Sequence, residues 1–264
     1  MTSKTTSSGG IQIWLQRLIA AFFLMGQVVV HLLKAKINRR NTIEQMAIVG
    51  PDSLAIALVT ATFVGMVFTI QVAREFLDFG AGQAVGGVLA LALTRELSPV
   101  LTAVVIAGRV GSAFAAEIGT MRVTEQIDAL YILKTDPIDY LVIPRVIACS
   151  LMLPILTIIS LITGMIGGSI VATNLYEISQ ETFINSIRNF LQVWDLWSAL
   201  IKSVIFGALV AVIGCNWGLT TTGGAKGVGE STTTAVVTAL IAIFITNFFL
   251  SWLMFQGLGR SSMV

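Results

Sequence analysis

The sequence predicts an all-α integral membrane protein, with about five transmembrane helices and an N-terminal amphipathic helix that lies in the membrane interface. Hydrophobic residues make up 55% of the 264 positions, whereas charged residues make up only 11%. The mean hydropathy is +0.88. Soluble domains carry roughly 25% charged residues, so this chain has too few to cover a surface that faces water. Several apolar runs also reach the length of about 20 residues that a helix needs to cross a bilayer.

The first 46 residues precede the expected membrane domain. We expect residues 1–10 to be disordered, and residues 11–46 to form an interfacial helix followed by a basic linker. The apolar run at 11–33 is long enough to cross the membrane, but a broken polar stripe interrupts it. The stripe consists of Gln12, Gln16, Arg17, Gln27, His31 and Lys34. An amphipathic helix in the interface is therefore favoured, with a sixth span as the alternative.

A single membrane domain is expected over residues 47–259. Its predicted spans are residues 53–73, 97–118, 146–172, 203–219 and 233–256. The glycine-rich stretch 81–94 is too short to cross alone, and it predicts an interfacial or re-entrant approach to the second span. Residues 220–234 predict a flexible connector, because their Gly-Gly-Ala-Lys-Gly lacks the spacing of a phosphate-binding loop. We therefore expect no ATP site within this chain.

The distribution of basic residues predicts the orientation. With five spans and a cytoplasmic N-terminus, most lysines and arginines fall at the inner boundary, as the positive-inside rule requires. The inner set is Lys4, Arg17, Lys34, Lys36, Arg39, Arg40, Arg122, Lys134, Arg145 and Lys226, and the outer set is Arg74, Arg188, Lys202 and Arg260. The C-terminus is then expected outside.

Charged residues in and beside the second span are the first candidates for function. Arg95 and Glu96 stand just before Pro99 at its outer end, and Arg109 lies within it. An intramembrane charge costs on the order of 2.5–3.5 kcal/mol on insertion scales, so it normally faces a partner or a wet cavity. For Glu96, a structural ion pair and the rim of a headgroup-binding cavity remain equal alternatives. For Arg109 the ion pair is favoured.

Small residues recur every four positions in the same span. Such a stripe lets another helix approach closely within lipid, and ordinary helix packing is its favoured interpretation. The packing residues are Ala107, Gly108, Gly111, Ala115 and Gly119.

The segment 117–139 is acidic, although it lies on the side of the membrane that favours positive charge. Met121, Glu125 and Asp128 share one face of a helix, and apolar residues share another. The segment is short and continuous with a span. A docking helix for a soluble partner explains these facts better than a solvated turn.

Several classes of function are excluded or disfavoured. No catalytic motif is present, and the net charge of +2 with unclustered basic residues does not suggest a nucleic-acid partner. Cys149 and Cys215 fall in apolar runs and are typical of small core residues. Because His31 is the only histidine, most histidine-ligated metal sites are excluded, and we expect no metal.

Four groups of residues resemble the MlaE permease family. They are Arg-Glu-Leu-Ser-Pro-Val at 95–100, Ala-Gly-Arg-Val-Gly-Ser-Ala at 107–113, Ala-Glu-Ile-Gly-Thr-Met-Arg-Val-Thr-Glu-Gln-Ile-Asp-Ala-Leu at 116–130, and Asp-Pro at 136–137. The resemblance covers about residues 43–255, and it is especially close to cyanobacterial and chloroplast-envelope lipid permeases. It implies an MlaE-like fold for the transmembrane permease subunit of an ABC transporter. Such a subunit moves phospholipid or a related lipid between the inner membrane and a periplasmic or intermembrane carrier with MCE domains.

The resemblance also implies partners and residue roles. The chain would form a homodimer and bind a separate P-loop ABC ATPase, which holds ATP and Mg²⁺, so no cofactor is expected in this chain. The lipid cavity would be lined by Phe68, Gln71, Val72, Arg95, Glu96 and Leu97. ATPase coupling would involve Glu117, Met121, Arg122, Glu125, Gln126, Asp128 and Leu130.

Two other functions and a second location stay open. An ion-coupled secondary transporter would need acidic residues deep in several spans and often inverted repeats, and a non-transporting membrane scaffold would need only the docking helix. The absence of a transit segment favours a bacterial, specifically cyanobacterial, inner or plasma membrane. The plastid inner envelope is the alternative.

Overall fold

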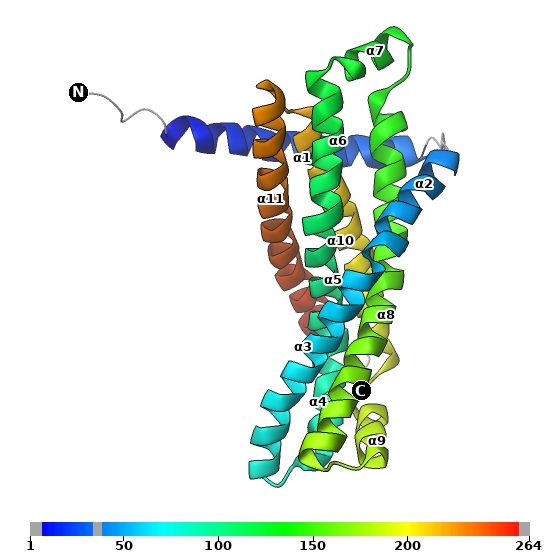
Figure 1. Ribbon diagram of the computed structural model, residues 1–264, viewed down its shortest axis with the longest axis vertical. Coiled ribbons are helices and arrows are strands. Elements are labelled where there is room, and N and C mark those ends of the chain that lie inside the picture. Colours follow the sequence, from blue (N-terminus) through cyan, green and yellow to red (C-terminus); the bar gives the residue numbers. More distant parts are fainter. Residues whose placement is uncertain (1–6, 34–38, 259–264) are drawn as a thin grey trace, which may run out of the picture. The chain divides into compact units, whose positions relative to one another are not determined.

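The computed structural model describes residues 7–33 and 39–258, and it contains helices but no strand within them (Figure 1). This confirms the predicted all-α class. In chain order the elements are α1 (Ser7–Leu33), α2 (Arg39–Val49), α3 (Pro51–Asp78), η1 (Gly82–Ala84), α4 (Val85–Ala92), η2 (Leu93–Leu97), α5 (Ser98–Ile106), η3 (Ala107–Gly111), α6 (Ser112–Val123), α7 (Gln126–Ile132), η4 (Ile138–Val142), α8 (Ile143–Tyr176), α9 (Gln180–Phe190), α10 (Val193–Leu219), α11 (Gly224–Trp252) and η5 (Leu253–Leu258).

Five continuous helical stretches among the described residues are long and apolar enough to cross a membrane. They are Arg39–Asp78, Gly82–Val123, Ile138–Tyr176, Val193–Leu219 and Gly224–Gln256. Each predicted span falls within one of them, and α1 is not among them. The chain is therefore a multi-pass membrane protein with the expected number of spans.

The helices form two compact units. The first comprises Met1–Met46, Ala107–Cys149 and Ala208–Ile241, and the second comprises Ala47–Ile106, Ser150–Gly207 and Ala242–Val264. Because α8, α10 and α11 each contribute residues to both units, neither unit is a separate segment of the chain.

In the first unit, α1 runs crosswise to α6 (Figure 1). Arg17 Nη2 donates to the carbonyl oxygen of Thr220 at 3.1 Å, and Asn216 Nδ2 donates to the carbonyl oxygen of Arg17 at 2.9 Å. Farther along α1, His31 Nδ1 lies 2.6 Å from Asp139 Oδ1. This crossing supports the interfacial interpretation of α1. The helix begins at Ser7, within the range expected to be disordered, and residues 1–6 lie outside the described part.

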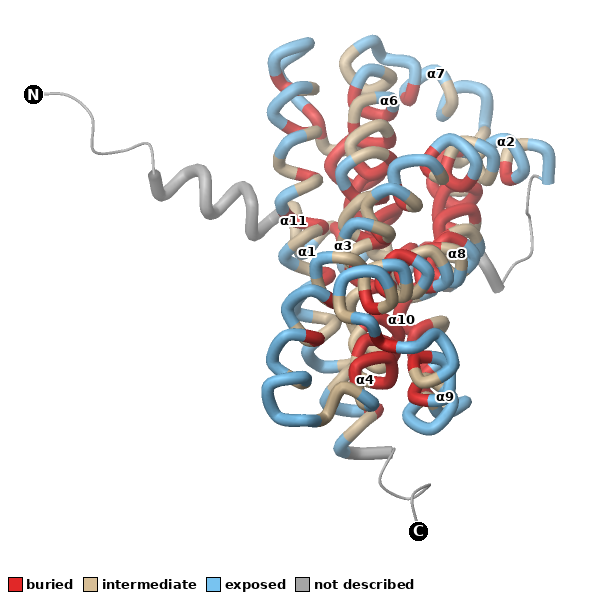
Figure 2. Tube along the Cα trace, turned by 60° about the horizontal axis from the view of Figure 1, so that its bottom comes forward, coloured by how far each residue is buried: buried red, intermediate tan, exposed pale blue. Residues whose placement is uncertain are grey.

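In the second unit, α4 is packed against α3, α8 and α9. Figure 2 shows that buried residues follow α4, whereas α3 is exposed over much of its length. The α3–α8 contact depends on glycine, because a Cβ on Gly65 would overlap the backbone of Gly164. A core cluster forms around α4 and consists of Ala73, Val85, Leu89, Leu93, Leu161, Ala172, Ile178 and Phe183.

The glycine-rich stretch 81–94 is helical from Gly82 onward and runs directly into the second span, so it is not a re-entrant loop, and its location in the membrane interface stays a prediction. It is the first part of the long helical stretch Gly82–Val123. Its glycines serve packing and do not break the helix: a Cβ on Gly86 would lie 2.5 Å from the carbonyl oxygen of Phe183.

The predicted flexible connector at 220–234 was also wrong over most of its length. Helix α10 ends at Leu219 and α11 begins at Gly224, so only four residues separate them. The threonines of this segment fit a helix because their hydroxyls donate to carbonyls of the preceding turn, as Thr234 does to Glu230 at 2.7 Å.

Candidate functional site

Four charged residues meet in the second unit where η2 faces α10. Arg95 Nε donates to Asp195 Oδ1 at 2.8 Å, and Lys202 Nζ donates to Glu96 Oε1 at 2.9 Å. Arg95 and Glu96 are neighbours in the π-helical segment η2, whereas Asp195 and Lys202 are seven residues apart, about two turns of α10. We call these four residues the charged cluster.

Polar residues of α11 complete the charged cluster. Asn247 Nδ2 donates to Glu96 Oε2 at 2.7 Å, and Ser251 Oγ donates to Glu96 Oε1 at 2.7 Å. Lys202 Nζ also donates to the carbonyl oxygen of Arg95 at 2.6 Å. The cluster therefore joins three spanning stretches through charge-assisted hydrogen bonds.

Burial is uneven across the charged cluster. The side chains of Lys202 and Asp195 keep 0% and 1% of their surface exposed, whereas those of Glu96 and Arg95 keep 41% and 30%. Each buried charge is thus compensated by a partner that reaches an open surface. Because a buried charge without a partner is costly, the two pairs hold η2 against α10.

A cavity of about 580 Å³ lies beside the exposed side of the cluster. Leu91, Ala92, Phe248 and Trp252 give it apolar walls, while Arg95 and Glu96 form its charged edge. The guanidinium of Arg95 also lies 4.6 Å from the centre of the Phe255 ring, which is a cation–π distance. Apolar walls with a charged edge suit a molecule that has a polar head and an apolar body.

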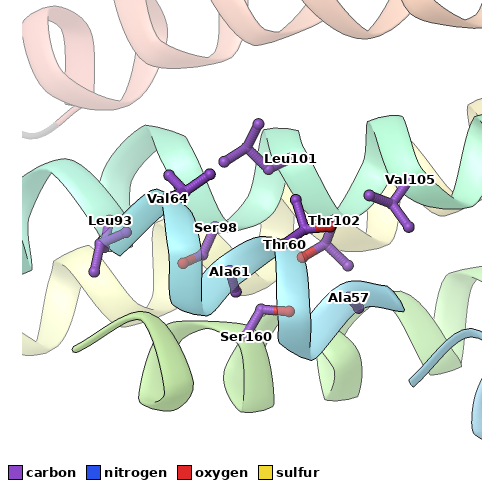
Figure 3. A pocket seen from close by; sticks show the side chains of 10 residues that line it. All are labelled: Ala57, Thr60, Ala61, Val64, Leu93, Ser98, Leu101, Thr102, Val105 and Ser160. Carbon is purple, nitrogen blue, oxygen red and sulfur yellow. The ribbon is translucent and has the colours of Figure 1, made fainter. Parts of the chain in front are cut away.

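A second cavity, where α3, α5 and α8 meet, is far smaller (Figure 3). Its volume is about 10 Å³, room for at most a single water molecule. The hydroxyls of Ser98 and Ser160 line it and have no hydrogen-bond partner among the described residues. It cannot accommodate a lipid.

Of the six residues predicted to line a lipid cavity, the structure brings Arg95 and Glu96 to the 580 Å³ cavity. Phe68 and Leu97 pack against the core cluster, while Gln71 is exposed and Val72 is half-buried. None of these four lines the cavity. Sequence reasoning missed Asp195, Lys202, Asn247 and Ser251 as partners of the two charges.

The small-residue stripe meets a second stripe on α10 in the first unit. A Cβ on Gly214 would lie 2.8 Å from the carbonyl oxygen of Gly111, and one on Gly218 would lie 3.2 Å from that of Ala115. Ala107 and Gly119 are also buried, whereas Gly108 is exposed with nothing near its missing Cβ. Arg109 is half-buried in η3.

The predicted coupling segment consists of α6, a tight turn and the short helix α7 in the first unit, and we call this segment the hairpin. A turn after α6 places Glu125 at φ +61°, and α7 follows it. Arg122 Nη1 donates to Asp128 Oδ1 across this turn at 2.9 Å. Glu117 accepts a 2.6 Å hydrogen bond from Arg145, and its side chain keeps 53% of its surface exposed.

Exposure differs along this hairpin. Met121 and Leu130 are half-buried, whereas Glu125 and Gln126 are exposed. Three consecutive apolar side chains that the sequence analysis did not select, Tyr131, Ile132 and Leu133, are also exposed. The hairpin thus offers acidic and apolar groups together.

Comparison with known proteins defines the class. Residues 42–253 match the family described as Permease MlaE, so the chain belongs to the MlaE permease family, as the sequence motifs predicted. The relatives below include probable ABC transporter permeases, and the chain is accordingly an ABC transporter permease of this family.

Individual relatives are similar over nearly the whole chain. The chain is 70% identical to a probable ABC transporter permease protein of Synechocystis sp. (strain ATCC 27184 / PCC 6803 / Kazusa), over 99% of both chains. It is 56% identical to the chloroplastic protein TRIGALACTOSYLDIACYLGLYCEROL 1 of Arabidopsis thaliana, over 90% of this chain and 68% of that one. It is 52% identical to a probable ABC transporter permease protein of Pyropia yezoensis, over 95% of each.

Proposed function

We propose that this permease moves phospholipid or a related lipid, as one half of a homodimer, between the inner membrane and a periplasmic or intermembrane carrier with MCE domains. The observation that carries the proposal is the cavity with apolar walls and a charged edge at Arg95 and Glu96. Lipids combine a polar headgroup with apolar chains, so they match both parts of its lining. The Arabidopsis relative bears the name of a galactolipid, which supports a lipid cargo.

A homodimer accounts for the open side of this cavity. Helix α11 exposes Phe248 and Trp252, which line the cavity, and it also exposes Phe244 and Phe249. A second copy of the chain that covers this face would enclose the cavity and separate the bound lipid from the surrounding bilayer. The cavity would then narrow or open as the two copies move, a two-state change that ATP binding biases.

Lipid transfer in proteoliposomes tests the proposal. The transporter is reconstituted with its ATPase, and Leu91→Trp narrows the cavity with a larger side chain while the four charged residues stay unchanged. We expect transfer of labelled phosphatidylglycerol to fall at least tenfold. The matched control, Leu151→Trp, alters an exposed leucine of α8 outside the cavity and should transfer at the wild-type rate. Equal rates in both variants would place the lipid elsewhere.

The ATPase is proposed to bind the hairpin of α6 and α7. Its exposed acidic residues and the apolar tip at Tyr131, Ile132 and Leu133 suit a soluble subunit, which would carry the ATP and Mg²⁺. With the N-terminus in the cytoplasm, this hairpin lies inside and α9 lies outside. The cyanobacterial relative supports a bacterial inner or plasma membrane, while the plastid envelope stays the alternative.

Charge reversal tests this coupling. Glu125→Lys puts a cation on the exposed turn. Both glutamate and lysine are non-glycine residues, so each must adopt the same positive φ at this position. We expect ATP hydrolysis to lose its response to lipid, measured as phosphate release by the purified complex. Glu230→Lys reverses an exposed carboxylate on α11 and serves as the control. Lipid-stimulated hydrolysis that survives Glu125→Lys at the wild-type level would contradict the docking assignment.

A further inference from the structure

A polar groove of about 500 Å³ lies between α9 and the start of α4 in the second unit. Its volume falls within the range of roughly 300–1,000 Å³ that is usual for small-molecule sites. Gln83, Thr182, Asn185, Ser186, Asn189 and Phe190 line it. It is separate from the cavity beside the charged cluster, because the two share no lining residue.

Close packing of α9 on α4 forms the groove before any ligand binds. Gly87 N–H donates to Ser186 Oγ at 2.9 Å. A Cβ on Gly87 would lie 2.5 Å from the Phe190 ring, so the ring rests directly on the α4 backbone. At the start of α9, Ser179 Oγ accepts from Thr182 N–H as a helix cap. The side chains on this face of α9 are thus held by a fixed backbone.

Three carboxamides in the groove make no hydrogen bond within the described part of the chain. Asn185 and Asn189 are one turn apart on α9, and Gln83 faces them from the segment before α4. None of the three makes a hydrogen bond to another described residue. Each amide offers both a donor and an acceptor, and the Phe190 ring adds an apolar wall.

The charge of the lining selects the ligand class. No acidic or basic side chain lines the groove among the described residues. A phosphate group would need arginine, lysine or several backbone N–H groups, and a metal ion would need carboxylate or imidazole ligands. Hydroxyl groups, in contrast, donate and accept at once, as amides do, and the C–H faces of a sugar ring pack on an aromatic ring.

We infer that this groove binds a neutral glycosyl group, which deepens the proposed lipid transport by adding a site for an uncharged sugar headgroup. This inference rests on the proposed lipid transport in one respect only, namely that the glycosyl group belongs to a lipid headgroup. The basic-residue distribution predicts that α9 lies on the outer side of the membrane, where a headgroup is accessible without crossing the bilayer.

Binding of two defined probes tests the inference. The full chain is placed in phosphatidylcholine nanodiscs, and the retention of added digalactosyldiacylglycerol or phosphatidylglycerol is measured by native mass spectrometry. The variant is Asn185→Leu/Asn189→Leu, which removes both amides at nearly constant volume. The control is Asn174→Leu, which alters an exposed asparagine of α8 outside the groove.

We expect the double variant to retain galactolipid about tenfold more weakly, since it loses two hydrogen bonds to the headgroup. Its retention of phosphatidylglycerol should stay at the wild-type level, and the control should match the wild type with both lipids. Equal galactolipid retention in the wild type and the double variant overturns the inference. If the double variant also loses retention of phosphatidylglycerol, the two amides serve the fold and not a glycosyl group, and this result overturns the inference too.

A soluble-sugar arm separates the two sources of the glycosyl group. Free methyl β-galactoside that displaces the galactolipid only at far higher concentration supports a lipid headgroup. Equal affinity for the free sugar overturns the lipid source. The outcome is independent of the proposed transport, because failure of phosphatidylglycerol transfer in proteoliposomes contradicts that function and leaves the galactolipid measurement unchanged.

Discussion

Glu96 and Lys202 form an ion pair whose two members differ in their contact with solvent or lipid. Lys202 has no exposed side-chain surface, whereas Glu96 keeps 41%. Glu96 also accepts hydrogen bonds from Asn247 and Ser251. Removing the exposed member leaves the buried charge without a partner. We therefore expect this removal to lower the free energy of unfolding more than removal of the buried member does. The same reasoning applies to Arg95 and the buried Asp195.

This asymmetry predicts the outcome of a double-mutant cycle. Glu96→Gln leaves the buried ammonium of Lys202 without a carboxylate, so we expect the free energy of unfolding to fall by about 3–5 kcal/mol. Lys202→Met should cost less, because Glu96 keeps its other hydrogen bonds. The double variant should recover most of the loss, since replacing a whole buried pair is often neutral. Thermal unfolding in detergent measures all three, and strictly additive losses would show that the pair is not coupled.

At the scale of single elements, glycine sets how closely helices approach. Gly214 and Gly218 of α10 face the small-residue stripe of η3 and α6, so the backbones come into contact. In lipid, such packing replaces the hydrophobic effect as the force that holds helices together. The stripe on the second span therefore serves the chain's own helix packing at Gly111 and Ala115.

Alanine substitution distinguishes the glycines that contact a neighbouring helix from those that do not, through its effect on stability. Gly214→Ala puts a methyl group 2.8 Å from the Gly111 carbonyl oxygen, and the overpacking is expected to cost about 1–3 kcal/mol. Gly108→Ala meets nothing within 4 Å and should be neutral or stabilising by up to about 1 kcal/mol, because alanine favours a helix. The melting temperatures of the two purified variants check this. Equal melting temperatures would mean that the helices separate freely at Gly214.

The elements also show where sequence reasoning succeeded. Apolar runs predicted all five spans, because a membrane helix has to keep charges out of its centre. The helical structure of 81–94 and of most of 220–234 was not predicted, since glycine and threonine are poor helix formers in isolation. Packing on α9 and hydroxyl-to-carbonyl hydrogen bonds overcome that preference, and neither can be read from local composition.

The charged cluster was only half predictable for a related reason. Arg95 and Glu96 stand out in an apolar run, and the spacing of Asp195 and Lys202, or of Asn247 and Ser251, marks one face of a helix. Which helices are neighbours is a tertiary property, so the sequence could not assign Lys202 to Glu96. For the same reason Phe68 was expected in the cavity, yet it packs against the core cluster.

For the whole molecule, the family and the cavity lead to one account. This MlaE-family ABC permease has, among its described residues, five helical stretches that are long and apolar enough to cross a membrane, a cavity with apolar walls and a charged edge, and an exposed hairpin. Lipid transport by this chain requires that the cavity hold lipid and that the hairpin respond to ATP. Binding of lipid in the cavity is the requirement on which the other depends.

Native mass spectrometry of the detergent-purified chain tests this binding most directly, because it counts bound lipid without any partner subunit. We predict that the wild type and Leu151→Trp retain phospholipid, while Leu91→Trp, which narrows the cavity beside Arg95 and Glu96, retains at least tenfold less. Retention by Leu91→Trp equal to that of the wild type would contradict the account.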